Sequence, residues 1–421
     1  MKILVLGSGA REHAIITALL REEPRPSVEC APGNAGIAAE VPVVALDPND
    51  PVAVTDYAVL HSIELVVIGP EAPLVAGVAD ALRARGIAVF GPDRAAAALE
   101  GSKTFAKRIM DEAGVPTGRA VRAGTLVEAE TALDEFGAPY VVKADGLAAG
   151  KGVLVTPDRV AAIAHATFWL EHGSVLIEEF LDGQEISLFL LSDGQNVLPL
   201  SPAQDYKRLS DNDAGPNTGG MGAYSPLPWL DAQFGSENAF VDEIIETVAL
   251  PTVRQLSAEG TPFVGLLYCG LILTDAGIRV IEFNARFGDP ETQVVLPRLI
   301  TPLSGLLFAA ATGVLGSLPR PVFSTEVAVT VVLASENYPE TPLIGREITG
   351  LAGALAVDGV TIAHAATRLD SEVLVSTGGR VLSVVAVGDS FAEARARAYE
   401  SLGHVSLAGA HFRTDIAARV A

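Results

Sequence analysis

A stretch in the second half of the chain, IEFNARFGDPET at residues 281–292, begins by alternating apolar and polar side chains. In an extended strand successive side chains point to opposite faces, so this pattern predicts one apolar face and one polar face. The residues on the apolar face would be Ile281, Phe283 and Ala285, and those on the polar face Glu282, Asn284 and Arg286. The polar face offers a carboxylate, an amide oxygen and a guanidinium group in a row. Oxygen ligands of this kind suit Mg²⁺, and the guanidinium group suits a phosphate or carboxylate. An edge strand with a solvated polar face is an equally open interpretation of this pattern alone.

The composition is that of a globular enzyme. At 421 residues, about two to four domains are expected, and 49% of the residues are apolar and 19% charged. The only cysteines, Cys30 and Cys269, lie in apolar runs, which argues against a disulfide framework. The apolar run at the first residues is too short for a signal peptide, and no membrane-spanning segment is predicted. We therefore expect a cytoplasmic protein.

The net charge of −22 argues against nucleic acid as a partner, because binding to its phosphate backbone needs a basic surface. An acidic protein that handles nucleotides must rely on local cations and a metal. Only six of its 29 basic residues are lysines, and four of those fall inside the motifs described below; the six are Lys2, Lys103, Lys107, Lys143, Lys151 and Lys207.

The first 101 residues alternate strand-like and helix-like segments, which predicts a parallel α/β sheet. The predicted strands are Ile3–Leu6, Val28–Cys30, Val41–Ala45, Leu65–Ile68 and Ile87–Phe90, and the predicted helices are Arg11–Glu22, Pro51–Leu60 and Leu74–Arg85. A glycine-rich turn, Gly7–Ala10, follows the first strand, at the place where such sheets bind anions. Glu12 replaces the last glycine of the dinucleotide fingerprint, which disfavours a hydride-transfer cofactor. A phosphate of another ligand and a purely structural turn both remain open.

A second glycine-rich segment lies between two strand-like runs at residues 139–155. Lys143 ends the first run, and Lys151 lies among the glycines at 146, 150 and 152. Glycines let backbone N–H groups approach phosphates, and the lysines supply charge. A hairpin closing over a triphosphate fits this spacing better than a P-loop does, and a glycine hairpin without a ligand is the alternative.

The flanking segments carry further signals. Ser102 and Thr125 are placed to cap helices ending near Ala113 and Gly137, the second through a capping box with Glu128. Val175–Leu181 is predicted to be a strand with acidic residues near its end. Residues 201–224 form an unusually long segment with little periodicity, which favours a functional role.

The later part of the chain is predicted to be rich in strands. Gly265–Leu273 and Ile278–Phe283 are expected to pair as a hairpin around residues 275–277. Beyond residue 320 the pattern predicts a separate β-rich module with strands at Glu326–Leu333, Val373–Ser376 and Val381–Val387, followed by a helix from Ser390 to Leu402.

Together these motifs resemble the ATP-grasp family and, within it, the glycinamide ribonucleotide synthetases (phosphoribosylamine–glycine ligases). The resemblance runs the length of the chain, and its most specific blocks are PNTGGMG at 216–222 and the run at 282–292. Other matching blocks are GSGAREHA at 7–14, PGNAG at 32–36, GPEAPL at 69–74, EGSK at 100–103 and QDYKR at 204–208.

The resemblance implies an α/β (α+β overall) ATP-grasp architecture. It has a Rossmann-like N-terminal domain at 1–101, a central ATP-grasp domain at 102–120 and 187–320, a lid at 121–186, and a C-terminal β-rich domain at 321–421. The implied activity is ATP-dependent joining of glycine to 5-phosphoribosylamine, through glycyl phosphate, in purine biosynthesis.

The same resemblance implies roles for individual residues. The implied metal ligands, for Mg²⁺ or Mn²⁺, are Glu282 and Asn284. The residues implied to hold ATP are Lys103, Lys143, Gly150, Lys151, Gly152, Glu178, Glu179 and Glu185. Those implied at the glycine and acyl-phosphate site are Arg286, Lys207, Asp205 and Asn217. Those implied to bind the other substrate are Gly9, Arg11, Glu12, His13, Asn34, Gly288 and Asp289.

The expected partners are small-molecule substrates, not nucleic acid or membrane, and the chain is expected to be a monomer or a weak dimer. Two other functions remain open at this point. One is a different ATP-grasp ligase, such as a purine-intermediate carboxylase or a D-alanine–D-alanine ligase. The other is a non-catalytic nucleotide-binding relative.

Overall fold

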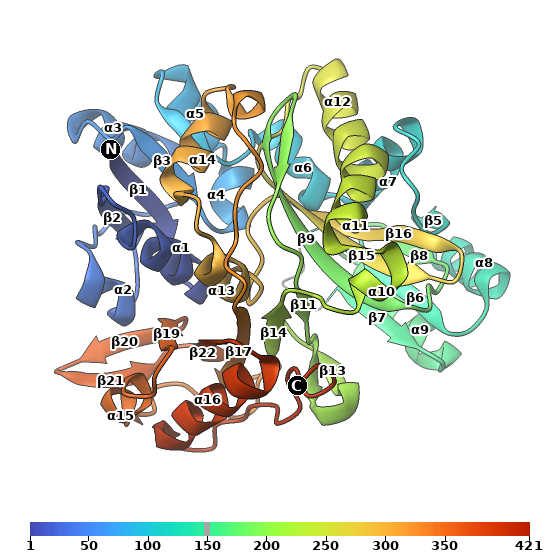
Figure 1. The fold of residues 1–421 in the computed structure, drawn as a ribbon. Helices are drawn as coiled ribbons and strands as arrows, with labels where there is room; N and C mark the ends of the chain where they lie inside the picture. Colours follow the sequence, from blue (N-terminus) through green and yellow to red (C-terminus); the bar gives the residue numbers. More distant parts are fainter. Residues whose placement is uncertain (147–151) are drawn as a thin grey trace.

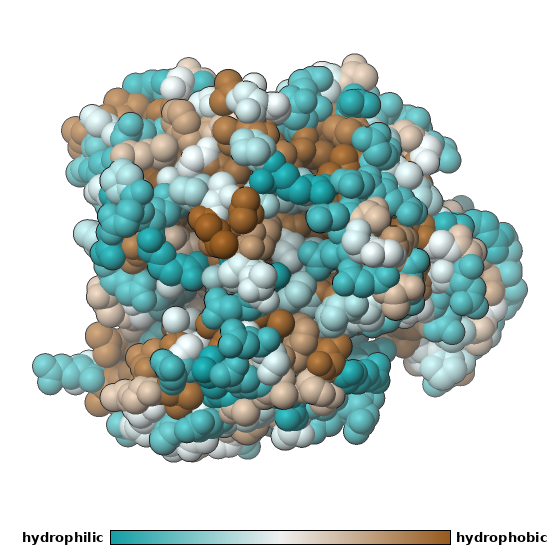
Figure 2. All heavy atoms as spheres, in the orientation of Figure 1, coloured by the Kyte–Doolittle hydropathy of each residue, from teal (hydrophilic) through white to brown (hydrophobic). Residues whose placement is uncertain are grey.

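A computed structural model describes residues 1–146 and 152–421 of the chain. The described residues form four sheets of four or five strands. Three of them surround the middle of the molecule, and the fourth, with the order β5-β8-β6-β7, lies to the right in the view of Figure 1. On the face shown in Figure 2, hydrophilic residues cover most of the surface and hydrophobic residues occur in small groups. No helix within the described residues is long and apolar enough to cross a membrane.

The N-terminal domain is built on a four-stranded parallel sheet, as predicted. Its order is β2-β1-β3-β4, and all three pairings are parallel. The strands are β1 (Lys2–Gly7), β2 (Ser27–Pro32), β3 (Leu65–Ile68) and β4 (Ala88–Phe90). The helices are α1 (Ala10–Leu20), α2 (Ala35–Glu40), α3 (Pro51–Leu60), α4 (Glu71–Ala76), α5 (Val78–Ala84) and α6 (Arg94–Gly101).

Two predictions in this domain are wrong. Residues 41–45 do not form a strand, because only Val43 makes an isolated bridge, to Cys30. The helix predicted at Leu74–Arg85 is two helices, because Gly77 takes a left-handed conformation (φ 86°) that ends α4 before α5 begins.

The lid forms its own four-stranded sheet with a small core. Its order is β5-β8-β6-β7, and β6 and β7 pair as the predicted antiparallel hairpin. The elements are β5 (Ala120–Ala123), α8 (Leu126–Phe136), β6 (Tyr140–Ala144), β7 (Val153–Thr156), α9 (Arg159–Leu170) and β8 (Val175–Glu178). Both predicted caps are confirmed: Thr125 and Glu128 form a capping box on α8, and Ser102 caps α7 (Lys103–Glu112), which leads into the lid.

The central sheet has the order β10-β9-β15-β16 and lies beside the N-terminal domain (Figure 1). The predicted hairpin is confirmed as β15 (Val264–Thr274) and β16 (Gly277–Asn284). The other elements of this region are β9 (Gln184–Asp193), β10 (Val197–Pro199), α10 (Leu230–Phe234), α11 (Glu237–Ile244), a π-helical turn (Ile245–Ala249), α12 (Leu250–Ala258), α13 (Thr292–Val295) and α14 (Leu303–Ala311).

A bulge in β16 decides which side chains face the site. Pairing with β15 shifts between Val280 and Glu282, so Ile281 is an extra residue in the ladder. Ile278 and Val280 face the core before the bulge, and Phe283 and Ala285 face it afterwards. The bulge reverses the alternation, because one additional residue moves all later side chains to the opposite face. The prediction for Phe283 and Ala285 is therefore confirmed, whereas Ile281 lines the pocket instead of the core.

The C-terminal sheet takes its strands from two parts of the chain. Its order is β11-β14-β17-β22-β19, and two of its strands, β11 (Gln204–Asp205) and β14 (Gly222–Ser225), come from the long central segment. That segment, which showed little periodicity in the sequence, therefore contains regular strands. It also holds the small pair β12 (Arg208–Ser210) and β13 (Ala214–Asn217). The remaining elements are β17 (Val327–Ala334), β18 (Ile348–Thr349), α15 (Leu351–Leu355), β19 (Val360–His364), β20 (Thr367–Asp370), β21 (Val373–Ser376), β22 (Arg380–Gly388), α16 (Phe391–His404) and β23 (Ser406–Leu407).

The N-terminal domain is tied to the C-terminal sheet by two side chains near α1 and α2. The backbone N–H of His364, on β19, donates to Nδ1 of His13 at 2.8 Å, and Nδ2 of Asn34 donates to the carbonyl oxygen of His364 at 2.7 Å. Because Nδ1 of His13 accepts, the proton of the neutral ring lies on Nε2, 3.2 Å from Glu40 Oε1. These contacts hold the N-terminal domain against β19 of the C-terminal sheet.

We expect His364 to make the protein less stable in acid. Burial, and secondly the charge of His13, lower the pKa of His364 to about 4, whereas an unfolded chain holds this proton up to pH ~6.5. The unfolded state therefore binds more protons in this window, and the free energy of unfolding falls as the pH drops from about 6.5 towards 4. Urea unfolding of His364→Asn should show a flatter pH dependence than the unsubstituted chain. His172→Asn, at an exposed lid position, is the control; identical pH slopes in the His364→Asn variant and the parent would contradict the assignment.

Candidate active site

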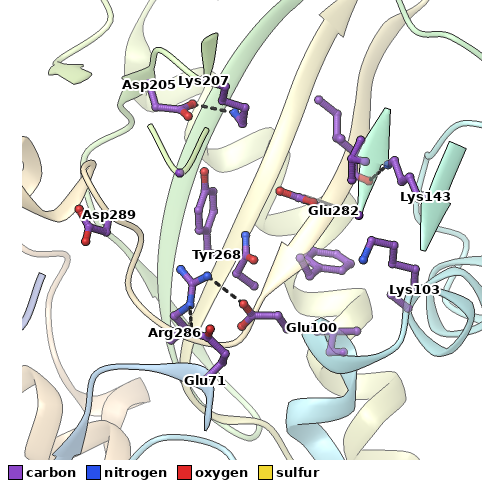
Figure 3. A pocket seen from close by; sticks show the side chains of 18 of the residues that line it. Glu71, Glu100, Lys103, Lys143, Asp205, Lys207, Tyr268, Glu282, Arg286 and Asp289 are labelled. Carbon is purple, nitrogen blue, oxygen red and sulfur yellow. Dashed lines mark hydrogen bonds and ion pairs between the residues drawn. The ribbon is translucent and has the colours of Figure 1, made fainter. Parts of the chain in front are cut away.

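The predicted residues converge on a cavity of about 500 Å³ between the lid hairpin, the central sheet and the N-terminal domain. In the view of Figure 3, Lys103 and Lys143 lie on one side of it, and Asp205, Lys207 and Asp289 on the other. Helices α6 and α7, strands β15 and β16 and the segment after β11 supply half of its lining residues. The cavity therefore has a basic side next to the lid and a more acidic side next to the C-terminal sheet.

Glu282 and Asn284 lie on the cavity face of β16, as predicted. Within the described residues, neither side chain has a hydrogen-bond partner, although polar groups at such positions are usually paired. No group of three or more His, Cys, Asp or Glu side chains in the described ranges is placed to hold a metal. Two protein oxygens and open positions fit Mg²⁺, which keeps several ligands from phosphates and water. The donor set on β16 therefore fits a cation that is shared with a phosphate ligand.

Lys143 is the most deeply buried cation of the basic side. Its Nζ lies 2.9 Å from Glu178 Oε2 and 3.3 Å from the carbonyl oxygen of Ile281. Burial opposes its charge, but Glu178 and Glu282 outweigh that effect and raise the pKa of Lys143. Lys143 thus remains charged at neutral pH near the carboxylate of Glu282.

Lys103 and Lys107 complete this side from helix α7. Lys103 Nζ donates to the carbonyl oxygen of Gly146 at 3.1 Å, and Lys107 Nζ lies 3.4 Å from Glu178 Oε2. Burial lowers the pKa of both lysines, and the nearby carboxylates oppose that shift. Gly152 also lines the cavity, whereas Gly150 and Lys151 lie outside the described residues.

The three glutamates predicted to hold ATP occupy different surroundings. Glu178 is buried and paired with the lysines of the basic side. Glu179 pairs with Arg119 at 2.9 Å, away from the cavity lining, and Glu185 pairs with Lys207 at 2.6 Å. The structure therefore brings only Glu178 to the wall of the cavity.

Arg286 is held by two carboxylates. Its Nη2 lies 2.9 Å from Glu100 Oε1 and its Nε 3.2 Å from Glu71 Oε2 (Figure 3). Burial opposes the charge of Arg286, and these two carboxylates outweigh it and raise its pKa. Burial, only partly offset by Arg286, raises the pKa of Glu100. The guanidinium group thus joins the N-terminal domain to the end of β16.

The acidic side centres on Lys207. Its Nζ lies 2.6 Å from Glu185 Oε2 and 2.8 Å from Asp205 Oδ1. Burial raises the pKa of Asp205 to about 7; Lys207 opposes this shift, and Glu291 and Glu185 add to it. Asn217 pairs with Arg208 in the short β12–β13 ladder and does not line the cavity.

Glu291 and Tyr268 extend the acidic side, and neither residue was predicted from the sequence. Tyr268 Oη donates to Glu291 Oε1 at 2.5 Å and lies 2.8 Å from Ser187 Oγ. A Cβ added at Gly288 would lie 2.5 Å from Glu291 Oε2, so glycine is required there for this carboxylate to pack. Asp289 lies on the same wall, with Oδ2 3.3 Å from Nη2 of Arg380.

The glycine-rich turn after β1 is largely occupied by protein groups. Glu12 Oε2 accepts the Gly9 N–H at 2.6 Å, and Arg11 Nε donates to Glu12 Oε1 at 2.6 Å. His13 and Asn34 contact β19, as described above. Of the predicted residues around this turn, the structure brings Arg11 to the cavity lining, but not Gly9, Glu12, His13 or Asn34.

Sequence reasoning gave no role to several residues that line the cavity: Glu71, Glu100, Lys107, Tyr268, Glu291, Tyr338 and Arg380. Glu291 lies in the opening stretch, and Glu71 and Glu100 lie in blocks that carried the resemblance. Tyr268 pairs directly with Asn284 across the β15–β16 hairpin, which a register argument would have found. Tyr338 and Arg380 reach the cavity only through tertiary packing.

Three family models cover nearly the whole chain. The phosphoribosylglycinamide synthetase N domain matches residues 1–100, the ATP-grasp (A) domain residues 101–292, and the C domain residues 328–419. The chain belongs to the phosphoribosylglycinamide synthetase family. This membership confirms the resemblance and the ATP-grasp fold predicted from the sequence.

Relatives of this synthetase family are similar over full length. Phosphoribosylamine–glycine ligase of Leifsonia xyli subsp. xyli is 72% identical over 100% of both chains, and that of Streptomyces coelicolor is 57% identical, also over 100% of both. The crystal structure of phosphoribosylamine–glycine ligase from Thermotoga maritima is 33% identical, with a TM-score of 0.82, and the match covers 99% of this chain and 100% of that one. As an ATP-grasp ligase family, the synthetases use ATP and a divalent metal.

Proposed function

We propose that this chain is the ADP-forming ligase that joins glycine to 5-phosphoribosylamine, giving glycinamide ribonucleotide, ADP and phosphate, a step of purine biosynthesis. The observation that carries the proposal is the two-sided cavity. A basic side with two oxygen ligands that have no hydrogen-bond partner within the described residues is suited to a metal-bound triphosphate, and an acidic side next to Lys207 is suited to an amino acid. Its full-length relatives carry the name of the same activity.

The chemistry requires no protein nucleophile. Glycine's carboxylate oxygen forms a bond to the γ-phosphorus of ATP as the bond to ADP breaks, which gives glycyl phosphate. The amine nitrogen of phosphoribosylamine then bonds to the carbonyl carbon, phosphate leaves, and the nitrogen loses a proton. Such steps depend on positioning and charge neutralisation, which buried lysines and carboxylates provide.

On the basic side, Lys103 and Lys143 would neutralise the phosphates, with Lys151 and the glycines at 150 and 152 contributing from the lid hairpin. Glu282 and Asn284 would hold Mg²⁺, or Mn²⁺ in its place, which when bound would draw charge from the phosphate oxygens. Glu178 would orient the lysines, and Glu179 and Glu185 would contact the nucleoside after movement of the lid. The burial and pairing of Lys143 support this arrangement.

On the other side, Asp205 and Lys207 would receive glycine, with Asn217 nearby and Arg286 facing the acyl phosphate. Arg11 and Asp289 would contact phosphoribosylamine from the cavity wall, and Gly9, Glu12, His13, Asn34 and Gly288 would shape the turns behind that wall. Arg11 supports this placement best because it lines the cavity and donates to the carbonyl oxygen of Phe287 at 3.2 Å.

We propose the domain division 1–101, 102–120 with 187–320, 121–186 and 321–421. The parallel N-terminal sheet and the separate lid core support the first and third parts of this division, whereas the sheet of the last part also includes β11 and β14 from the central part. We also propose action in the cytoplasm, where purine synthesis takes place, and a monomer or weak dimer in solution.

A coupled ADP-release assay tests the proposed reaction. With ATP and Mg²⁺, ADP release should require both glycine and freshly generated phosphoribosylamine, and omission of either should reduce it to background. ADP release with D-alanine, or with bicarbonate and a purine intermediate, would instead indicate a different ATP-grasp ligase. ATP binding without turnover under all conditions would indicate a non-catalytic relative.

A further inference from the structure

The C-terminal sheet reaches the cavity at one place. Tyr338, which follows β17, and Arg380, at the start of β22, both line the wall next to Gly219. The two residues are neighbours, because a Cβ added at Gly379 would lie 2.3 Å from Cδ2 of Tyr338. Both belong to the last hundred residues, to which the reaction described above assigns no part.

These two side chains hold both backbone polar groups of one residue, Gly219, in the PNTGGMG segment. The N–H of Gly219 donates to Tyr338 Oη at 2.9 Å, and Nη1 of Arg380 donates to the Gly219 carbonyl oxygen at 2.5 Å. Nη1 of Arg380 also donates to the carbonyl oxygen of Asp289 at 2.7 Å, in the segment that follows β16. Arg380 therefore links two segments that border the acidic side of the cavity.

The fit around this segment is tight. A Cβ at Gly219 would lie 3.0 Å from Cζ of Arg380, and one at Gly220 would lie 2.4 Å from Cδ of Pro290. Gly220 also has a φ of 107°, which other residues rarely adopt. Two adjacent glycines are thus required for Arg380 and Pro290 to approach the backbone this closely.

The held segment in turn supports Lys207. The N–H and Oγ1 of Thr218 donate to the Lys207 carbonyl oxygen at 2.7 Å and 2.9 Å. The residue next to the clamped peptide therefore fixes the backbone of the lysine whose Nζ lies between Asp205 and Glu185. Arg380 and Tyr338 bind Gly219, and the adjacent residue, Thr218, binds the backbone of Lys207.

We propose that Tyr338 and Arg380 form a clamp of positioning residues, through which the C-terminal sheet holds Lys207 in place for the amino acid substrate. The clamp acts on the glycine side of the cavity and not on the ATP side, because Lys103 and Lys143 are held by the lid and α7 instead. This inference rests on the proposed ligase reaction for its kinetic part, and on geometry alone for its structural part.

The test compares Tyr338→Phe, Arg380→Lys and Arg380→Ala with Arg368→Ala. Arg368 is the matched control because it is an exposed arginine of β20 with no side-chain hydrogen bond or ion pair in the described part of the chain. Hydrogen exchange measured on peptides covering residues 215–222 reports the clamp without any turnover. Steady-state kinetics then give KM for glycine and for ATP separately.

Exchange in residues 215–222 should be faster in Tyr338→Phe and Arg380→Ala and unchanged in Arg368→Ala. The value of kcat/KM for glycine should fall roughly tenfold in Arg380→Ala while KM for ATP changes by less than about twofold, the size expected for losing charge-assisted bonds on one side of a site. Arg380→Lys should recover part of the loss, since an ammonium group can keep one of the two carbonyl contacts.

Unchanged exchange in both Tyr338→Phe and Arg380→Ala would overturn the clamp, whatever the chain catalyses. A loss in Arg380→Ala without any effect of Tyr338→Phe would also overturn it and would make Arg380 a direct substrate contact. An equal rise in the KM values of glycine and ATP would indicate a general structural role. Absence of ligase turnover in the parent chain would reject the proposed reaction and leave the exchange result as the test of the clamp.

Discussion

Replacing Glu282 with Gln is expected to lower the rate of ADP release by ~100-fold or more, because loss of an indirect metal partner alone costs about 10–100-fold. The carboxylate oxygen is one of two protein oxygens on the cavity face of β16, and a neutral amide is a weaker ligand for a hard cation. The fold should remain intact, because the Glu282 side chain makes no hydrogen bond within the described residues. The measurement is ADP release as a function of Mg²⁺ concentration, together with the midpoint of thermal unfolding.

Asn284→Ala should give a similar loss, and excess Mg²⁺ should restore part of the activity in both variants. Glu340→Gln is the matched control, since Glu340 is an exposed carboxylate with no side-chain hydrogen bond or ion pair among the described residues. Near-normal turnover in both the Glu282 and Asn284 variants would reject the metal assignment. A loss that excess Mg²⁺ leaves unchanged would assign the residues to another role.

Replacing Lys143 with Met is expected to abolish measurable turnover and to lower the free energy of unfolding by about 3 kcal/mol, the lower end for breaking a buried ion pair. Lys143 and Glu178 are 6% and 7% exposed, and their charged atoms lie 2.9 Å apart. The substitution leaves Lys107, 3.4 Å away, as the one cation paired with the buried Glu178 carboxylate in the described part of the chain, and this remaining pair is the reason for taking the lower end. It also removes the donor to the carbonyl oxygen of Ile281 in the β16 bulge.

The double variant Lys143→Met with Glu178→Gln separates the two effects. Because it leaves no unpaired carboxylate at this position, it should recover most of the lost stability in urea unfolding, while ADP release stays absent. Lys2→Met is the control, since Lys2 forms a partly exposed pair with Glu29 at the far end of β1. Turnover in the double variant near that of the parent would show that the charge of Lys143 is not needed for catalysis.

Much of the fold could be predicted because its signals are local. The caps at Ser102 and Thr125, the hairpin at residues 264–284 and the β–α alternation of the first hundred residues depend on side chains a few positions apart. The Glu282 and Asn284 pair could be placed on one face for the same reason. Its interpretation as a metal site needed the other motifs, because a single alternating strand is also typical of a solvated edge.

The predictions that failed concern segments whose structure depends on contacts with residues far away in the sequence. Gly77 divides a segment whose apolar content suggested one helix, and the bulge at Ile281 changes faces without a glycine or proline to mark it. The long segment at 201–224 lacks periodicity because its strands are only two to four residues long, and one of them, β14, joins the C-terminal sheet by pairing with β17, about a hundred residues later.

The sequence by itself determined the family, the parallel N-terminal sheet and the lid hairpin, and it singled out Lys143, Glu282 and Asn284 as site candidates, because each depends on short-range spacing and residue type. Only the tertiary structure decided that Glu71 and Glu100 hold Arg286, that Tyr268 holds Glu291, and that Tyr338 and Arg380 hold Gly219. These partners lie from about 20 to more than 200 residues apart in the chain. Nothing in local periodicity selects such partners, and burial of charge requires that each finds one when the sheets pack.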